Sequence, residues 1–179
     1  MRKWRWLNLS ILVALLSLSG ATRTPAAEQI VLEYGFLSGS VAVADLENLA
    51  KTGETSLDLK LYLMLANQKP ETLRDILNQE VAVNGELLEG ILTTPPGEMM
   101  LDRVGEILHT PDKKDNRQAL RSAIVDSALP DGNITLLEVL QNYPTDELHI
   151  NGDRVGELAA TIDNAIAQLP DWLVRILIR

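Results

Sequence analysis

Prolines divide this chain into short segments and limit the length of any helix that it can form. The prolines with the clearest effect are Pro70, Pro95, Pro96, Pro111, Pro144 and Pro170. A proline fits the first turn of a helix, where its missing N–H is not needed, but it ends a helix that reaches it from the N-terminal side. The spacing therefore favours many short helices.

Apolar residues between these prolines recur at the helical period. Helices are expected at about residues 43–51, 56–67, 70–78, 84–92, 95–110, 115–124, 135–143 and 155–169. The clearest is the last, because Val155, Leu158, Ile162, Ile166 and Leu169 fall on one face. The pattern predicts a mainly α fold with about eight short helices.

A minor β element is expected beside these helices. Residues Gln29–Tyr34 have a β-rich composition, and Gly35 then allows residues 36–41 to run back as a second strand. Residues Glu147–Ile150 form a candidate third strand that turns at residues 151–152. The β element therefore has two or three strands.

The segment from Ser56 to Asn67 fits two structures. Its leucines alternate along the chain, which is a strand pattern. It lacks β-branched residues, however, and Leu, Lys, Met and Ala all favour helix. Since Leu57, Leu61 and Met64 also share one helical face, we predict a helix.

Local sequence also predicts how several elements end. Thr135 and Glu138 have the spacing of a capping box, in which each side chain accepts a hydrogen bond from the other residue's backbone N–H. Asp115 is expected to cap the helix that follows it. His109 is expected in the last turn of the 95–110 helix, where it complements the helix dipole. We expect His149 to be an ordinary surface or edge residue of its strand.

Several residue types and motifs on which common catalytic sites depend are missing. The chain has no cysteine and only two histidines, which excludes thiolate chemistry and a site with three histidine ligands. The nearest text to a Gly-x-Ser-x-Gly nucleophile elbow is Gly35-Phe-Leu-Ser-Gly39, whose spacing is wrong. We therefore assign no catalytic, cofactor-binding or metal-binding residue.

One segment partly matches a calcium-binding loop. Asp131, Gly132 and Glu138 have the positions of its second half, but Leu129 occupies a ligand position and cannot coordinate calcium. The alternative, a tight turn followed by a capped helix, uses Glu138 for the cap. We favour that alternative.

The first residues have the layout of a cleavable signal peptide. Arg2, Lys3 and Arg5 precede an apolar run from about residue 7 to 18, and small residues follow as far as Ala27. Crossing a bilayer takes about 20 apolar residues, so a retained anchor is the less favoured alternative. We expect cleavage after Ala26 or Ala27 and export to a periplasm, a lumen or the cell exterior, with no stable membrane span in the processed chain.

The charge of the processed chain limits its partners. The whole chain carries a formal charge of -9, and removing residues 1–27 leaves about 12 basic against 25 acidic residues. Such a chain repels nucleic acid and anionic lipid, both of which need Lys and Arg to neutralise phosphates. A protein partner or a hydrophobic ligand remains open.

We divide the chain into a signal peptide at residues 1–27, one helical domain at residues 28–169, and a short apolar helix or tail at residues 170–179. No Gly/Ser linker or repeat separates further units within residues 28–169. The tail, which includes Trp172 and Ile178, is expected to pack on the domain, with contact to a partner as the alternative.

The chain resembles a cyanobacterial domain of unknown function that is labelled as alpha/beta hydrolase. The resemblance extends in order from about Ala27 to Leu158. The stretches that carry it are AEQIVLEYGFL at 27–37, DLE at 45–47, TGE at 52–54, LANQ at 65–68, NRQALR at 116–121 and TLLEVLQNYP at 135–144.

The resemblance implies that a helical domain of this kind precedes a hydrolase domain in longer members. No catalytic residue transfers, because no position here matches the elbow, its acid or its histidine, and we expect that domain to be absent because the sequence stops at Arg179. Two hypotheses follow. The chain is a non-catalytic accessory or binding module, or it is a hydrolase that acts itself or with a separately encoded catalytic domain.

Overall fold

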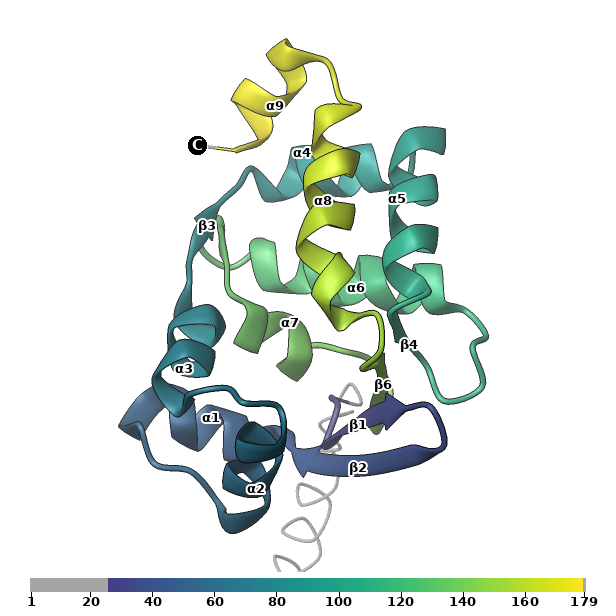
Figure 1. Ribbon diagram of the computed structural model, residues 1–179. Helices are drawn as coiled ribbons and strands as arrows, with labels where there is room; N and C mark the ends of the chain where they lie inside the picture. The colour runs from purple at the N-terminus through teal and green to yellow at the C-terminus, as the bar shows by residue number, and fades with distance from the viewer. Residues whose placement is uncertain (1–25, 179) are drawn as a thin grey trace, which may run out of the picture.

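The computed structural model describes residues 26–178, so the expected signal peptide lies outside it except for its last two residues. Most of the described residues are helical, and a small sheet lies among the helices (Figure 1). The predicted mainly α fold with a minor β element is confirmed. Within residues 26–178, no helix combines the length and the apolar character that crossing a bilayer requires.

The main sheet has four strands in the order β2-β1-β6-β4. Strands β1 (Gln29–Tyr34) and β2 (Leu37–Ala42) form the predicted antiparallel hairpin, with Gly35 at a positive φ of 54° in its turn. Strand β6 (Glu147–Asn151) lies parallel to β1, and the two-residue strand β4 (Leu108–His109) lies antiparallel to β6. This arrangement brings together three segments that are far apart in the sequence.

The two faces of this sheet differ in chemistry. Alternate residues Ile30, Val41, Leu108 and Leu148 point to one face and are buried in the core. The register places Glu33, Glu147, His149 and His109 on the other face. The sheet therefore has one face that packs in the core and one face that carries polar side chains.

Nine helices make up most of the other described residues. They are α1 (Val43–Thr52), α2 (Leu57–Leu65), α3 (Pro70–Asn78), α4 (Gly85–Leu92), α5 (Pro95–Gly105), α6 (Asn116–Ala128), α7 (Leu136–Gln141), α8 (Leu158–Ala167) and α9 (Asp171–Leu177), with a 3₁₀ turn at Val155–Glu157. A second, two-stranded sheet pairs β3 (Val81–Ala82) with β5 (Asn133–Ile134). Helices α1 to α3 lie at one end of the molecule, beside β2, and α9 lies at the other end (Figure 1).

Local sequence explains where several helices begin. Pro70 and Pro95 are the first residues of α3 and α5, as expected. Asn84 accepts a hydrogen bond from the backbone N–H of Leu87, and the Thr135–Glu138 capping box forms in full. Each such cap stabilises a helix by about 1 kcal/mol, because it satisfies a backbone N–H that has no partner inside the helix.

Two predicted helix ends are wrong. Helix α5 ends at Gly105, and the next residues pair with β6, which takes Leu108 and His109 out of the helix. Asp115 precedes α6 but does not cap it, because its φ of 56° is left-handed and its side chain makes no capping hydrogen bond. At the first place, pairing with the distant strand β6 overrides the local helical pattern.

The C-terminal tail lies against the body of the molecule. Leu177 is buried, its carbonyl oxygen accepts a hydrogen bond from the N–H of Asn84, and Ile178 forms an antiparallel bridge with Val83. Trp172 and Ile176 of the same helix remain exposed. The tail therefore packs on the segment that leads into α4.

Candidate functional site

A cluster of two histidines and two glutamates lies on the polar face of the main sheet. His149, in β6, has Nδ1 at 2.7 Å from Oε1 of Glu33 in β1 and Nε2 at 3.2 Å from Oε2 of Glu147. His109, in β4, stands directly opposite His149, and the two ring centres are 5.6 Å apart. We call Glu33, His109, Glu147 and His149 the histidine–carboxylate cluster.

Hydrogen bonding shows the charge of the His149 ring. An ionised carboxylate only accepts hydrogen bonds, so both ring nitrogens must donate, and His149 is an imidazolium when both glutamates are ionised. Burial opposes the charged ring, but hydrogen bonds to Glu33 and Glu147 raise the pKa of His149 above its ordinary value. The hydrogen bond from His149 lowers the pKa of Glu33, although burial acts in the opposite direction.

His109 has a different environment. Its side chain is 2% exposed, and Nδ1 lies 2.9 Å from the carbonyl oxygen of Thr110, to which it must donate. Its Nε2 lies 3.7 Å from Oε2 of Glu33, so one carboxylate faces both histidines. The expectation that His109 lies in the last turn of a helix and complements its dipole is wrong, because the residue is in strand β4.

The expectation for His149 is partly confirmed. The residue is in the predicted strand, but β6 is an interior strand and the side chain is 15% exposed, so it is neither a surface nor an edge residue. Glu33 and Glu147 were missed as its partners. Glu147 and His149 are two residues apart and so share one face of a strand, which is a sequence signal, but the approach of Glu33 depends on pairing across more than a hundred residues.

The loop after β4 is held by Thr110, which is 4% exposed. Its backbone N–H donates to Oδ1 of Asn116, and its hydroxyl lies 2.7 Å from the carbonyl oxygen of Lys114. Lys113 and Asp115 both have a left-handed φ, which costs free energy at residues other than glycine. The hydroxyl of Thr110 is thus engaged in ordering this loop.

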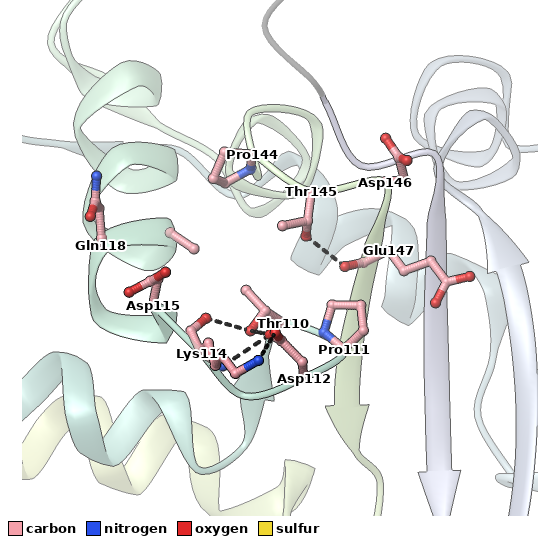
Figure 2. A pocket seen from close by; sticks show the side chains of 11 residues that line it. Thr110, Pro111, Asp112, Lys114, Asp115, Gln118, Pro144, Thr145, Asp146 and Glu147 are labelled. Atoms are coloured by element: carbon pink, nitrogen blue, oxygen red, sulfur yellow. Dashed lines mark hydrogen bonds and ion pairs between the residues drawn. The ribbon is translucent and has the colours of Figure 1, made fainter.

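An open pocket of about 640 Å³ lies beside the cluster, between this loop, the start of α6 and the segment before β6 (Figure 2). Its lining is mostly polar and acidic: Thr110, Pro111, Asp112, Lys114, Asp115, Gln118, Ala119, Pro144, Thr145, Asp146 and Glu147. The carboxylate of Glu147 extends away from the middle of the pocket (Figure 2) and bonds His149. The pocket therefore meets the cluster through Glu147.

Neither histidine is arranged as the base of a serine hydrolase. A catalytic triad needs an imidazole between a hydroxyl and a carboxylate. His149 lies between two carboxylates, and His109 lies between a carbonyl oxygen and a carboxylate. Neither ring therefore has a hydroxyl as its partner.

Residues 26–151 match the model of a family described as alpha/beta hydrolase of unknown function (DUF1400). This chain belongs to the DUF1400 family. The suspected resemblance is confirmed, although the matched description does not include a cyanobacterial origin. The matched residues run from before β1 to the last residue of β6, so they include the whole histidine–carboxylate cluster but neither α8 nor α9.

Two further comparisons add nothing to the DUF1400 assignment. No curated protein and no solved structure matches the chain. What this DUF1400 member does must therefore be inferred from its own residues and from the family's description.

The family is described as hydrolases, but the segment whose sequence comes nearest to a nucleophile elbow does not have the geometry of one. Residues Gly35 to Gly39 form the turn and start of the β1–β2 hairpin. A nucleophile elbow instead joins a strand to a helix and exposes a serine at the turn. Ser38 lies within β2, opposite Glu33 in the ladder.

The partial calcium-loop match also has a structural explanation. Oδ1 of Asp131 accepts a hydrogen bond from the N–H of Asn133, and Gly132 has a φ of 77°, as in a tight turn. Oε2 of Glu138 accepts hydrogen bonds from the N–H and the hydroxyl of Thr135. Among residues 26–178, no group of three or more His, Asp or Glu side chains is placed to hold a metal ion.

Helix α2 carries a second unusual feature. The predicted helix is confirmed, and Leu59 and Leu63 anchor it in the core. The apolar face that supported the prediction points outward instead: its exposed fractions are 86% for Leu57, 52% for Leu61, 69% for Met64 and 75% for Leu65. We call these four residues the α2 apolar face.

Proposed function

We propose that this chain is an exported, non-catalytic accessory module that binds an alpha/beta-hydrolase catalytic domain through the α2 apolar face. The observation that carries the proposal is the exposure of that face on a helix whose opposite side is already anchored. Exposed apolar patches of this kind on soluble proteins commonly mark interaction sites. The family description supplies the class of partner.

The shape and chemistry of the surface favour a protein over a small hydrophobic ligand. Small apolar ligands bind in concave sites with apolar walls. The α2 apolar face lies along one side of a helix, whereas two pockets found among the described residues are lined mostly by charged and polar residues. A flat or grooved protein surface fits the side of a helix better.

Charge adds a condition on the partner. The chain has a formal charge of -9, and about -13 without residues 1–27. A partner with basic residues around an apolar contact would therefore associate faster, and salt would slow that association.

The proposal is tested by capture with a matched pair of variants. The tagged full chain is incubated with the exported fraction of its host, and bound proteins are identified by mass spectrometry. Leu61→Glu should abolish capture of a hydrolase-domain protein. Leu129→Glu should not, although both leucines are 52% exposed, because Leu129 lies at the end of α6.

Capture that survives Leu61→Glu would refute the role of α2. A captured partner without a hydrolase domain would refute the assigned class of partner. Circular dichroism should show that both variants remain folded.

The alternative function, hydrolysis by this chain itself, has the family description in its favour. A serine-reactive fluorophosphonate probe applied to the purified chain distinguishes the two functions. We expect no labelling, because both imidazoles are bound to carboxylates or to a carbonyl oxygen. Labelling of a single serine, blocked by prior heat denaturation, would overturn the proposal.

Export is tested by the N-terminus of the processed chain. Ala27 is 5% exposed and packs in the core, so processing after Ala26 retains a core contact that processing after Ala27 removes. We therefore expect Ala27 as the first residue of the protein recovered outside the cytoplasm. A chain recovered with Met1 from the membrane fraction would show instead that the N-terminal segment is a retained anchor.

A further inference from the structure

The histidine–carboxylate cluster joins parts of the chain that have no local connection. Glu33 is in β1, near the start of the described residues, and β1 leads through the hairpin to α1 and α2. His149 and Glu147 are in β6, which leads into α8 and α9. His109 in β4 adds a third segment, so the ion pairs of the cluster cross two strand boundaries.

Further bonds at the same end of the sheet reinforce this connection. The N–H of Gly152 donates to the carbonyl oxygen of Glu33 at 2.7 Å, and the N–H of Gly35 donates to Oδ2 of Asp153 at 2.9 Å. The residues after β6 are thus tied to the hairpin, and the charge of the cluster acts where the two halves of the chain meet.

We propose that the histidine–carboxylate cluster is a pH-sensitive contact between β6 and the β1–β2 hairpin. It holds β6 and the helices after it to the hairpin most firmly in mildly acidic solution. The proposal rests on the geometry of His149 between two carboxylates from different positions of the sheet. It does not depend on the function proposed for α2.

The charged groups around His149 come from every strand and loop packed against it. β1 contributes Glu33, β6 contributes Glu147, β4 contributes His109, and the loop after β4 brings the charge of Lys113 near Glu33. When His149 loses its proton, one ring nitrogen turns a lone pair toward a carboxylate. When Glu33 gains a proton, the carboxylate that faces both histidines loses its charge.

The two shifts together set the window of stability. The pKa of His149 is raised above its ordinary 6.5, so its contribution is complete below pH 6.5 and is lost as the pH rises through the folded-state pKa. The pKa of Glu33 is lowered from 4.5, so its contribution is complete above pH 4.5 and is lost as the pH falls through the folded-state pKa. Both contributions are complete between these two values.

The first test is an NMR titration of the two imidazoles in the full chain. The chain has only two histidines, so a single variant, His109→Asn, assigns both resonances. We expect the titration midpoint of His149 to lie above 6.5 and to fall in Glu147→Gln, whose side chain is 49% exposed and tolerates the change. A midpoint at or below 6.5 that Glu147→Gln leaves unchanged would overturn the proposal.

The second test uses amide hydrogen exchange of β1 and β6 to measure how firmly β6 is held to the hairpin. Above neutral pH, after correction for intrinsic exchange rates, protection of these strands should fall by up to about fivefold, which corresponds to the upper range for a partly exposed ion pair. His149→Asn should remove this pH dependence.

Glu157→Gln is the matched control, because Glu157 pairs with Arg154 on the surface and touches neither histidine. It should leave the pH dependence of protection as in the wild type. If protection depends on pH equally in the wild type and in His149→Asn, the proposed pH-sensitive contact is refuted. Because unfolded His149→Asn would exchange everywhere, protection in α6 verifies that the variant is folded.

Discussion

Helix α2 and the polar face of the main sheet depart from ordinary burial in opposite directions. Helix α2 exposes four large apolar side chains, including Leu57 at 86% and Leu65 at 75%. The sheet encloses two histidines, with His109 2% exposed and His149 15% exposed at the side chain. One region leaves apolar groups in water, and the other removes polar groups from it.

The two departures have different consequences. The polar groups of the cluster are satisfied inside the chain, because each imidazole faces a carboxylate or a carbonyl oxygen. The α2 apolar face has no such compensation within the described residues, since its leucines and methionine lie on the side away from Leu59 and Leu63. The cluster therefore needs no partner outside the chain, whereas the α2 apolar face is available for binding.

The largest expected change in stability distinguishes the buried side of α2 from its exposed side. Leu59→Ala should lower the free energy of unfolding by about 2–5 kcal/mol, because Leu59 is 3% exposed and its loss leaves a cavity in the core. Leu65→Ala makes the same chemical change at a residue that is 75% exposed and should alter stability by no more than about 0.5 kcal/mol. Urea unfolding of the two variants measures both values.

This pair of variants tests whether the two sides of α2 differ in burial. Equal losses for Leu59→Ala and Leu65→Ala would mean that α2 buries both sides, and the α2 apolar face would then not exist in solution. Loss of stability in Leu65→Ala alone would mean that the helix is rotated by about half a turn.

The same helix shows what the sequence can predict. Composition correctly predicted a helix at residues 56–67, because leucine, lysine and methionine favour that state. Which face is buried could not be predicted, because all residues of α2 except Asp58 and Lys60 are apolar and hence no face is distinguished. Ile76 of α3 is 47% exposed for a related reason: burial there depends on which neighbour covers the helix.

The cluster shows a different limit. The strands that contain Glu33 and His149 were predicted, and so was the hairpin around Gly35. The parallel pairing of β1 with β6 and the two-residue strand at His109 were not, since neither has a local pattern. Sites assembled from distant segments depend on this pairing, so the candidate site was mostly invisible before the fold was known.

A smaller change in stability tests the contact between α2 and strand β2. A Cβ added at Gly39 in β2 would lie 2.4 Å from the hydroxyl oxygen of Tyr62 in α2. Gly39→Ala should therefore displace the Tyr62 ring and lower the free energy of unfolding by about 1–3 kcal/mol. Gly90→Ala is the control, because nothing lies within 4 Å of a Cβ at this position inside α4, and it should stabilise by about 0.5–1 kcal/mol. Thermal unfolding of both variants is the measurement, and a neutral Gly39→Ala would place Tyr62 elsewhere.

The smallest expected effect concerns the acid limit of the cluster. The lowered pKa of Glu33 means that its contribution to stability disappears as the pH falls below 4.5, when this carboxylate gains a proton. Glu33→Gln should therefore be less stable than the wild type at pH 5.5, by less than about 1 kcal/mol, because the Glu33 side chain is 39% exposed and partly screened by water.

Toward pH 3 the stabilities of Glu33→Gln and the wild type should converge, since the wild type loses its charge at this position as the pH falls through the lowered folded-state pKa of Glu33. Urea unfolding at the two pH values tests this, with Glu54→Gln as an exposed control that should show no convergence. A constant difference between Glu33→Gln and the wild type at both pH values would mean that the carboxylate acts through packing. The cluster would then resemble the anchored side of α2, and the contrast between a charged and an apolar region would no longer hold.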